Sequence, residues 1–131
     1  MGLFIRAQAW TLGITIIVAL VGWFLLPSVV AGLMPDFAAG VPAARVALLA
    51  GIPYNLIDIA NNYILAKKLR RAYVANLAGG VVFQVISFVY LYATHNVSSY
   101  SIALSFVFVF CVYAFTSNLL VMWAHRRDSR V

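Results

Sequence analysis

The chain alternates between long apolar runs and short polar or basic breaks. Four continuous apolar runs extend over about residues 9–34, 43–66, 72–93 and 100–123. A helix rises about 1.5 Å per residue, so about 20 apolar residues cross a hydrocarbon core about 30 Å thick. A membrane β-barrel would instead need short segments of alternating apolar and polar residues. We therefore predict an all-α integral membrane bundle of four transmembrane helices, forming one domain over residues 1–131.

The breaks between the runs indicate turns and an orientation. Residues 35–42 contain two prolines and a glycine, which predicts a turn, and the second run stops at a basic cluster. If both termini are cytoplasmic, eight of the nine basic residues lie on the inner side, and only Arg45 lies outside. The eight are Arg6, Lys67, Lys68, Arg70, Arg71, Arg126, Arg127 and Arg130. This bias predicts a multi-pass membrane protein with both termini cytoplasmic.

The amino-acid composition excludes several classes of protein. Hydrophobic residues make up 65% of the chain and charged residues 9%, whereas charged residues approach a quarter of a soluble domain. The net charge of +6 lies at the ends of the runs, so we expect contact with membrane lipid and no nucleic acid. The first run is too long for the apolar region of a signal peptide, so we expect a retained anchor. Pro27 and Pro53 are expected to kink their helices.

Few residues offer catalytic or metal chemistry. The chain has three acidic residues, each in a different setting, and no paired carboxylates, nucleophile elbow or phosphate-binding loop. His95 and His125 are separated by a whole apolar run, and Cys111 lies alone in such a run, where it is expected to pack as a small apolar residue. We therefore expect no enzyme activity, no catalytic residue, no metal and no cofactor.

The most distinctive polar residues lie in the second run. Asn55, Asp58 and Asn62 follow at helical spacing, with Gly51 on the same stripe, and Asp58 is the only acidic residue inside an apolar run. A carboxylate at the bilayer centre costs about 2.5–3.5 kcal/mol on insertion scales. Cation binding, proton relay and substrate contact are functional interpretations of Asp58. The alternative is an interhelical hydrogen bond, for example to Gln84, and Asn55 and Asn62 have the same packing alternative.

A second polar stripe occupies the third run. It consists of Asn76, Gly80, Gln84 and Ser87, and the short preceding loop leads us to expect that it faces the stripe of the second run. The candidate substrate-binding or ion-binding residues are therefore Asp58, Asn55, Asn62, Gln84 and Asn76. The candidate head-group or phosphate contacts are Lys67, Lys68, Arg70 and Arg71, with the setting of membrane topology as the alternative role.

The order of motifs resembles a known family. The segments Leu26-Pro27, 33–42 (LMPDFAAGVP), Arg45-Val46 and 65–70 (LAKKLR) are similar to the C-terminal domain of polysaccharide flippases of the multidrug/oligosaccharidyl-lipid/polysaccharide exporter superfamily. The resemblance implies alternating-access movement of undecaprenyl-pyrophosphate-linked sugars across the cell (inner) membrane, where the chain is then expected to lie as a multi-pass protein. It also implies a pyrophosphate contact at the basic loop and a cavity lined by the Asn55/Asp58/Asn62 face. The ending from Asn118 to Arg127 has a weaker resemblance to GtrA-like translocases of lipid-linked sugars, which have four spans.

Two functional hypotheses follow. In the first, the chain helps to translocate a polyprenyl-linked saccharide across the cytoplasmic membrane. Flippases of the first family have twelve or more spans, so this chain is expected to act as a homo-oligomer or as a subunit of a larger membrane complex. In the second, it is a non-transporting accessory or structural subunit whose polar stripes only hold helices together.

Overall fold

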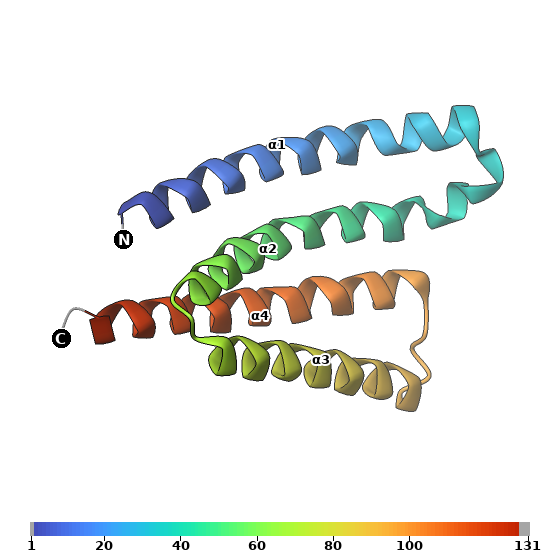
Figure 1. Cartoon of the computed structure of the whole chain (residues 1–131). Coiled ribbons are helices and arrows are strands. Elements are labelled where there is room, and N and C mark those ends of the chain that lie inside the picture. The colour runs from blue at the N-terminus through green and yellow to red at the C-terminus, as the bar shows by residue number, and fades with distance from the viewer. Residues whose placement is uncertain (1, 129–131) are drawn as a thin grey trace.

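The computed structural model describes residues 2–128, with side chains as far as Arg126. It contains the helices α1 (Gly2–Leu33), α2 (Val41–Ala66), α3 (Arg70–Ala93) and α4 (Ser99–Asp128), with the 3-10 helix η1 (Pro35–Gly40) between α1 and α2 (Figure 1). All four α-helices are long and apolar enough to cross a membrane. The prediction of an all-α bundle of four helices is therefore confirmed, and the four candidate membrane spans support a multi-pass membrane protein. Arg130 and the side chain of Arg127, both counted with the inner basic residues, lie outside the described part.

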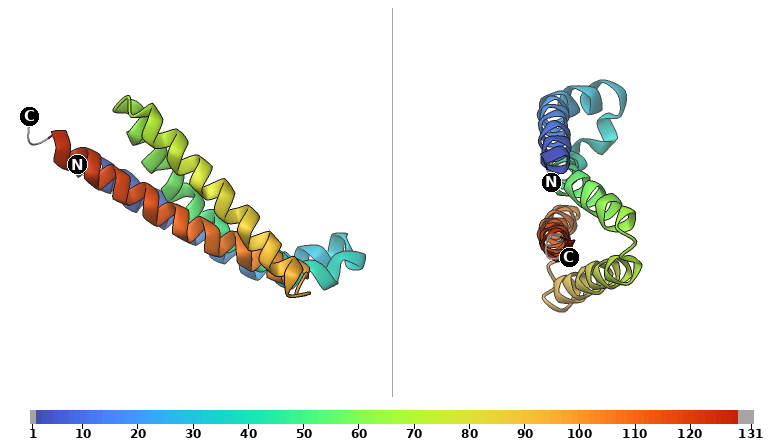
Figure 2. Two further views of the ribbon diagram at one scale, coloured as in Figure 1. Left: turned by 90° about the horizontal axis from the view of Figure 1, so that it is seen from below. Right: turned by 60° about the vertical axis from the view of Figure 1, so that its left-hand side comes forward.

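Each helix runs in the opposite direction to the one before it, and both ends of the described chain lie at one end of the bundle. The α2–α3 turn lies at that same end, whereas η1 and the α3–α4 turn lie at the other (Figure 1). α4 lies between α2 and α3, so the order across the bundle is α1, α2, α4, α3 (Figure 2). We expected α2 and α3 to face each other because their loop is short. They pack mainly on α4 instead, because a short loop fixes antiparallel direction and not which faces meet.

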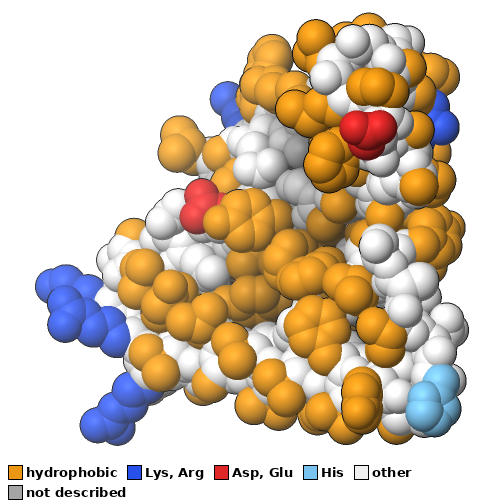
Figure 3. Space-filling model, turned by 90° about the vertical axis from the view of Figure 1, so that its right-hand side faces the viewer, with side chains coloured by type: hydrophobic (Ala, Val, Ile, Leu, Met, Phe, Trp, Pro, Cys, Tyr) orange, Lys and Arg blue, Asp and Glu red, His pale blue; other side chains and the backbone are white. Residues whose placement is uncertain are grey.

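The packed core is small and lies near the end that holds the termini. Ala60, Ile64 and Val121 are buried at the α2–α4 contact, and Phe4, Tyr63, Leu69, Tyr73 and Leu120 pack around them. Most other large apolar side chains are exposed, and they cover most of the face drawn in Figure 3. Lipid is as apolar as these side chains, so such a surface is the expected periphery of a membrane bundle.

The turns before and after α3 each contain a residue other than glycine with a left-handed backbone conformation. Lys68 has φ 58°, and the Leu69 amide donates to the carbonyl of Ile64, five residues back, at 3.2 Å. This is a Schellman cap, and the contact of Leu69 with the core around Ile64 is its usual hydrophobic partner. His95, with φ 53°, has the equivalent position after α3. The first cap ends α2 at Ala66, so Lys67 and Lys68 lie in the α2–α3 turn, and Arg70 and Arg71 begin α3.

Candidate functional site

A cavity of about 390 Å³ lies beside α4, between α2 and α3. It is lined by polar and aromatic side chains from all three helices: Tyr54, Ile57, Asp58, Asn61, Tyr73, Leu77, Gly80, Val81, Gln84, Phe106, Val109, Phe110 and Tyr113. Asp58, Leu77 and Val81 are exposed, so the cavity opens sideways between α2 and α3.

The α2 wall of the cavity follows from helical spacing. Tyr54, Asp58 and Asn61 lie at i, i+4 and i+7, which places them on one face of α2. The Asn62 side-chain amide donates to the Asp58 carboxylate at 3.4 Å. This distance exceeds the usual range of about 2.7–3.2 Å for such a bond, so the carboxylate keeps most of its capacity to accept hydrogen bonds.

Two buried amide oxygens reinforce this acceptor character. Nε2 of Gln84 donates to Oγ of Ser105 at 3.3 Å, while Oγ of Ser105 donates its own proton to the Ile102 carbonyl at 3.1 Å. The Ser105 hydroxyl can therefore only accept from Gln84, which directs Oε1 of Gln84 away from it. Oε1 of Gln84 is buried and has no hydrogen-bond partner. Oδ1 of Asn61 is also buried without a hydrogen-bond partner. The other end of this amide, Nδ2, donates to the Tyr113 hydroxyl at 3.4 Å.

Aromatic rings form much of the remaining wall. The ring of Phe110 lies 5.8 Å from that of Tyr54 and 5.9 Å from that of Phe106, measured between centroids. These distances and the tilted orientations are typical of favourable aromatic pairs. The pairs connect α2 to α4 and keep ring faces and edges along the cavity.

A glycine keeps part of the cavity open. A Cβ atom at Gly80 would lie 3.4 Å from the ring of Tyr113, whereas a Cβ atom at Gly79 would meet nothing within 4 Å. Gly80 therefore brings the α3 backbone close to α4, and a long side chain there would compete with Tyr113 for the same space. A side chain at position 79 would extend into a more open part of the surface.

Two of the predicted site residues lie elsewhere and hold helices together. Nδ2 of Asn55 donates to Oγ1 of Thr15 on α1 at 3.0 Å and to the Gly51 carbonyl at 2.9 Å. Asn76 donates to Oγ of Ser117 at 2.7 Å and accepts from Oγ1 of Thr116 at 3.0 Å. Asn55 therefore connects α2 to α1. Asn76 connects α3 to α4 through both its side-chain NH₂ group and its side-chain carbonyl.

The structure thus brings together Asp58 and Gln84, with Asn62 at the edge, and separates Asn55 and Asn76 from them. The second polar stripe meets α4, and Gln84 bonds to Ser105 there; Asp58 lies across the same cavity. Sequence reasoning missed Asn61, whose spacing of three from Asp58 was available as a signal. It also missed the tyrosines of the cavity, which resemble lipid-facing aromatic residues in a sequence.

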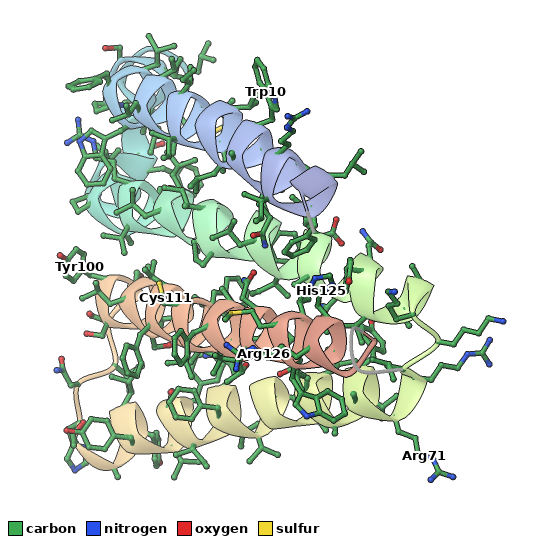
Figure 4. The ribbon with its side chains drawn as sticks, turned by 90° about the vertical axis from the view of Figure 1, so that its left-hand side faces the viewer. Trp10, Arg71, Tyr100, Cys111, His125 and Arg126 are labelled. Carbon is green, nitrogen blue, oxygen red and sulfur yellow. The ribbon has the colours of Figure 1, made fainter. Side chains whose placement is uncertain are left out.

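The basic cluster lies at the end of the bundle next to the cavity. Lys67, Lys68, Arg70 and Arg71 are all exposed, and the last three line a shallow hollow with Trp123. The Arg71 side chain points away from the helices (Figure 4). Tyr73, only two residues after Arg71, lines the cavity, so the cationic turn and the cavity are neighbours along α3.

The described residues contain no group of three or more His, Cys, Asp and Glu side chains that could hold a metal ion. The chemistry of the cavity is therefore that of one carboxylate, amides, phenols and aromatic rings. No family model, curated protein or solved structure matches the chain.

Proposed function

We propose that the chain is a membrane transport protein that helps to translocate a polyprenyl-linked saccharide across the cytoplasmic membrane. The observation that carries this proposal is the cavity that has polar side chains in its lining and a sideways opening between α2 and α3. A polyprenyl chain would remain in lipid while its head group enters through this opening. In the orientation that we propose, both termini and the α2–α3 turn face the cytoplasm.

The polar lining supports a binding role for the cavity. Ionisable residues within a membrane segment are costly and usually mark a pathway or a binding site. Asp58 and the unpartnered oxygens of Asn61 and Gln84 offer hydrogen-bond acceptors to the hydroxyl groups of a sugar. The aromatic rings offer flat apolar surfaces beside them. This combination of mostly apolar walls with a few polar groups is typical of small-molecule sites.

The basic turn supports recognition of a phosphate-linked head group. Asp58 lies eight residues before the end of α2 at Ala66, or about 12 Å along the helix axis. One head group would then place its sugar in the cavity and its phosphate at Lys68, Arg70 or Arg71. Arginine can grip phosphate with two parallel hydrogen bonds.

The size of the cavity supports an oligomer or a larger complex. A volume of about 390 Å³ is at the small end of the range of about 300–1,000 Å³ for ligand sites. This volume accommodates one head-group unit, whereas a route across a hydrocarbon core of about 30 Å is longer. A second copy or another subunit would therefore complete the route.

A flux measurement tests the proposal. The purified protein is reconstituted into vesicles with a fluorescent polyprenyl-pyrophosphate monosaccharide, and translocation is followed with a membrane-impermeant quencher. A hydrogen bond to a charged group contributes about 1.5–3 kcal/mol, so Asp58→Asn should lower flux about tenfold or more. Asp36→Asn, which changes a carboxylate in η1 outside the cavity, is the matched control. Wild-type flux in both Asp58→Asn and Asp58→Ala would reject the role of Asp58.

The second candidate function is a non-transporting accessory subunit. It is favoured by the use of Asn55 and Asn76 in helix-to-helix hydrogen bonds. It predicts that the wild-type protein gives no flux on its own, that it co-purifies with a larger membrane complex in fixed stoichiometry, and that Asp58 variants lose assembly. Native mass spectrometry of the same variants used for flux separates the two functions.

A further inference from the structure

We infer that the group bound in the cavity carries a protonated amine, so that the substrate class is an amino-sugar head group. This inference rests on the proposed function, since it concerns the same cavity. It concerns a property that transport of a saccharide does not require.

The charge of the lining favours a cation. Asp58 is the only residue of formal charge among the described lining residues, and none of these is Lys or Arg. A phosphate in the cavity would meet this carboxylate with no opposing cation, whereas an ammonium group would be attracted to it. The cationic residues lie outside the cavity, at the α2–α3 turn. The head group is therefore expected to place its positive part inside and its phosphate at the turn.

The unpaired atoms favour a hydrogen-bond donor with several protons. Oδ1 of Asn61 and Oε1 of Gln84 are buried acceptors without a partner. Leaving a buried polar atom unsatisfied is unfavourable, so a ligand that donates to both is stabilised relative to the empty cavity. An ammonium group has three donors and no acceptor. The side chains of Asn61 and Gln84 line the same cavity as Asp58, from α2 and α3, so three acceptor-bearing side chains surround the space in which an ammonium group would bind.

The aromatic rings favour an organic cation over a bare metal ion. Tyr54, Phe106 and Phe110 form a connected set of rings along the wall, with Tyr73 and Tyr113 nearby. Ring faces attract ammonium groups electrostatically, more strongly when water is excluded. A metal ion needs a close shell of oxygen ligands at about 2.0–2.6 Å. A cavity of about 390 Å³ with mostly apolar walls does not provide such a shell.

A binding comparison tests the inference without any transport. The full chain in detergent is titrated by native mass spectrometry with octyl glucosaminide, octyl N-acetylglucosaminide and octyl glucoside, at a pH at which the free amine is protonated. The alkyl chain is the same in all three, so the comparison isolates the amine. We expect octyl glucosaminide to bind about tenfold more tightly than the two neutral glycosides. Equal affinities would overturn the inference.

Matched variants identify the groups responsible. Asp58→Asn keeps the size of the side chain and removes its charge, and it should reduce the preference for the amine to near one. Gln84→Leu removes a buried acceptor and should reduce the preference partly, whereas Asp36→Asn should leave it unchanged. A full preference in Asp58→Asn would overturn the assignment to this cavity. A variant that keeps the oligomeric state of the wild-type protein in the same spectra is folded.

The outcomes separate this inference from the proposed function. Transport of a neutral lipid-linked saccharide by a protein without amine preference would reject the inference and leave the proposed function standing. A clear amine preference in a protein that gives no flux would leave the inference standing and reject autonomous transport.

Discussion

The Nε atom of Arg45 donates a hydrogen bond of 2.9 Å to the carbonyl oxygen of Trp23. Residue 23 lies four before Pro27, whose missing N–H leaves this carbonyl without its intrahelical donor. The guanidinium of Arg45 also lies over the Trp23 ring, 5.3 Å from the centroid. Arg45 therefore supplies the hydrogen-bond donor that Pro27 removes from α1, and it joins α1 to α2.

This relationship predicts a dependence between Arg45 and Pro27. Arg45→Met should lower the free energy of unfolding in detergent by about 1–3 kcal/mol, because the carbonyl of Trp23 loses its donor. In a Pro27→Ala background the restored N–H serves this carbonyl, so the same substitution should cost clearly less. A double-mutant cycle measured by denaturant titration gives the coupling. Arg6→Met, at an exposed position of α1, is the control, and strictly additive effects would contradict the explanation.

A second prediction concerns the packing of α3 on α4. Asn76→Ala removes two hydrogen bonds and leaves Ser117, which is fully buried, without this partner. Interhelical hydrogen bonds in membranes contribute about 0.6 kcal/mol on average and up to about 1.7 kcal/mol. We expect a loss of about 1–2 kcal/mol in the free energy of unfolding. Asn62→Ala changes an exposed amide and should have little effect; equal losses in the two variants would contradict the structural role of Asn76.

Two adjacent glycines provide a test of the cavity. Gly80→Leu should fill space beside Tyr113 and lower flux or ligand binding, because the new side chain extends from a Cβ already in contact with that ring. Gly80→Ala adds only this Cβ at 3.4 Å and should be tolerated. Gly79→Leu, in open space, should leave function near the wild-type level. If Gly79→Leu and Gly80→Leu reduced function equally, the cavity would not be the binding site.

The α2–α3 turn allows stability and charge to be separated. Lys68 has a left-handed backbone that costs a non-glycine residue about 1–2 kcal/mol, so Lys68→Gly should stabilise the turn. The same change removes a cation and should weaken binding of pyrophosphate-linked substrate. Lys67→Gly, at φ −80°, has no such strain to relieve and should destabilise the helix end. Thermal unfolding and vesicle binding measure the two effects, and a less stable Lys68→Gly variant would contradict the cap.

The orientation in the membrane can be measured directly. In a Cys111→Ser background, single cysteines are introduced as Lys68→Cys and His95→Cys, at opposite ends of the bundle. A membrane-impermeant maleimide added to intact cells should label only position 95, since the basic residues favour the cytoplasmic side. Labelling at position 68 before permeabilisation would reverse the orientation, and with it the assignment of the basic turn to the inner face.

Part of the candidate site was accessible from the sequence. Asp58 and Gln84 were predicted and both line the cavity, because an ionisable or amide side chain inside an apolar run is rare enough to be noticed. The grouping of Asp58 with Asn55 was less accurate. Spacings of three and four both fit a helical face, and the set of Tyr54, Asp58 and Asn61 fits one as well as the predicted stripe does.

The sequence by itself determined the class of the protein, the number of helices and the position of the turns. These depend on local properties, namely the length of each apolar run, Pro35 and Pro42 near the first turn, and the charges at the helix ends. Only the tertiary structure decided that α4 separates α2 from α3, that Asn76 pairs with Ser117, and that a cavity opens at Asp58. The physical reason is that these helices are apolar on nearly every side, since lipid replaces water around them. Hydrophobicity therefore does not mark their inner faces, and contacts between residues distant in the sequence set their rotation.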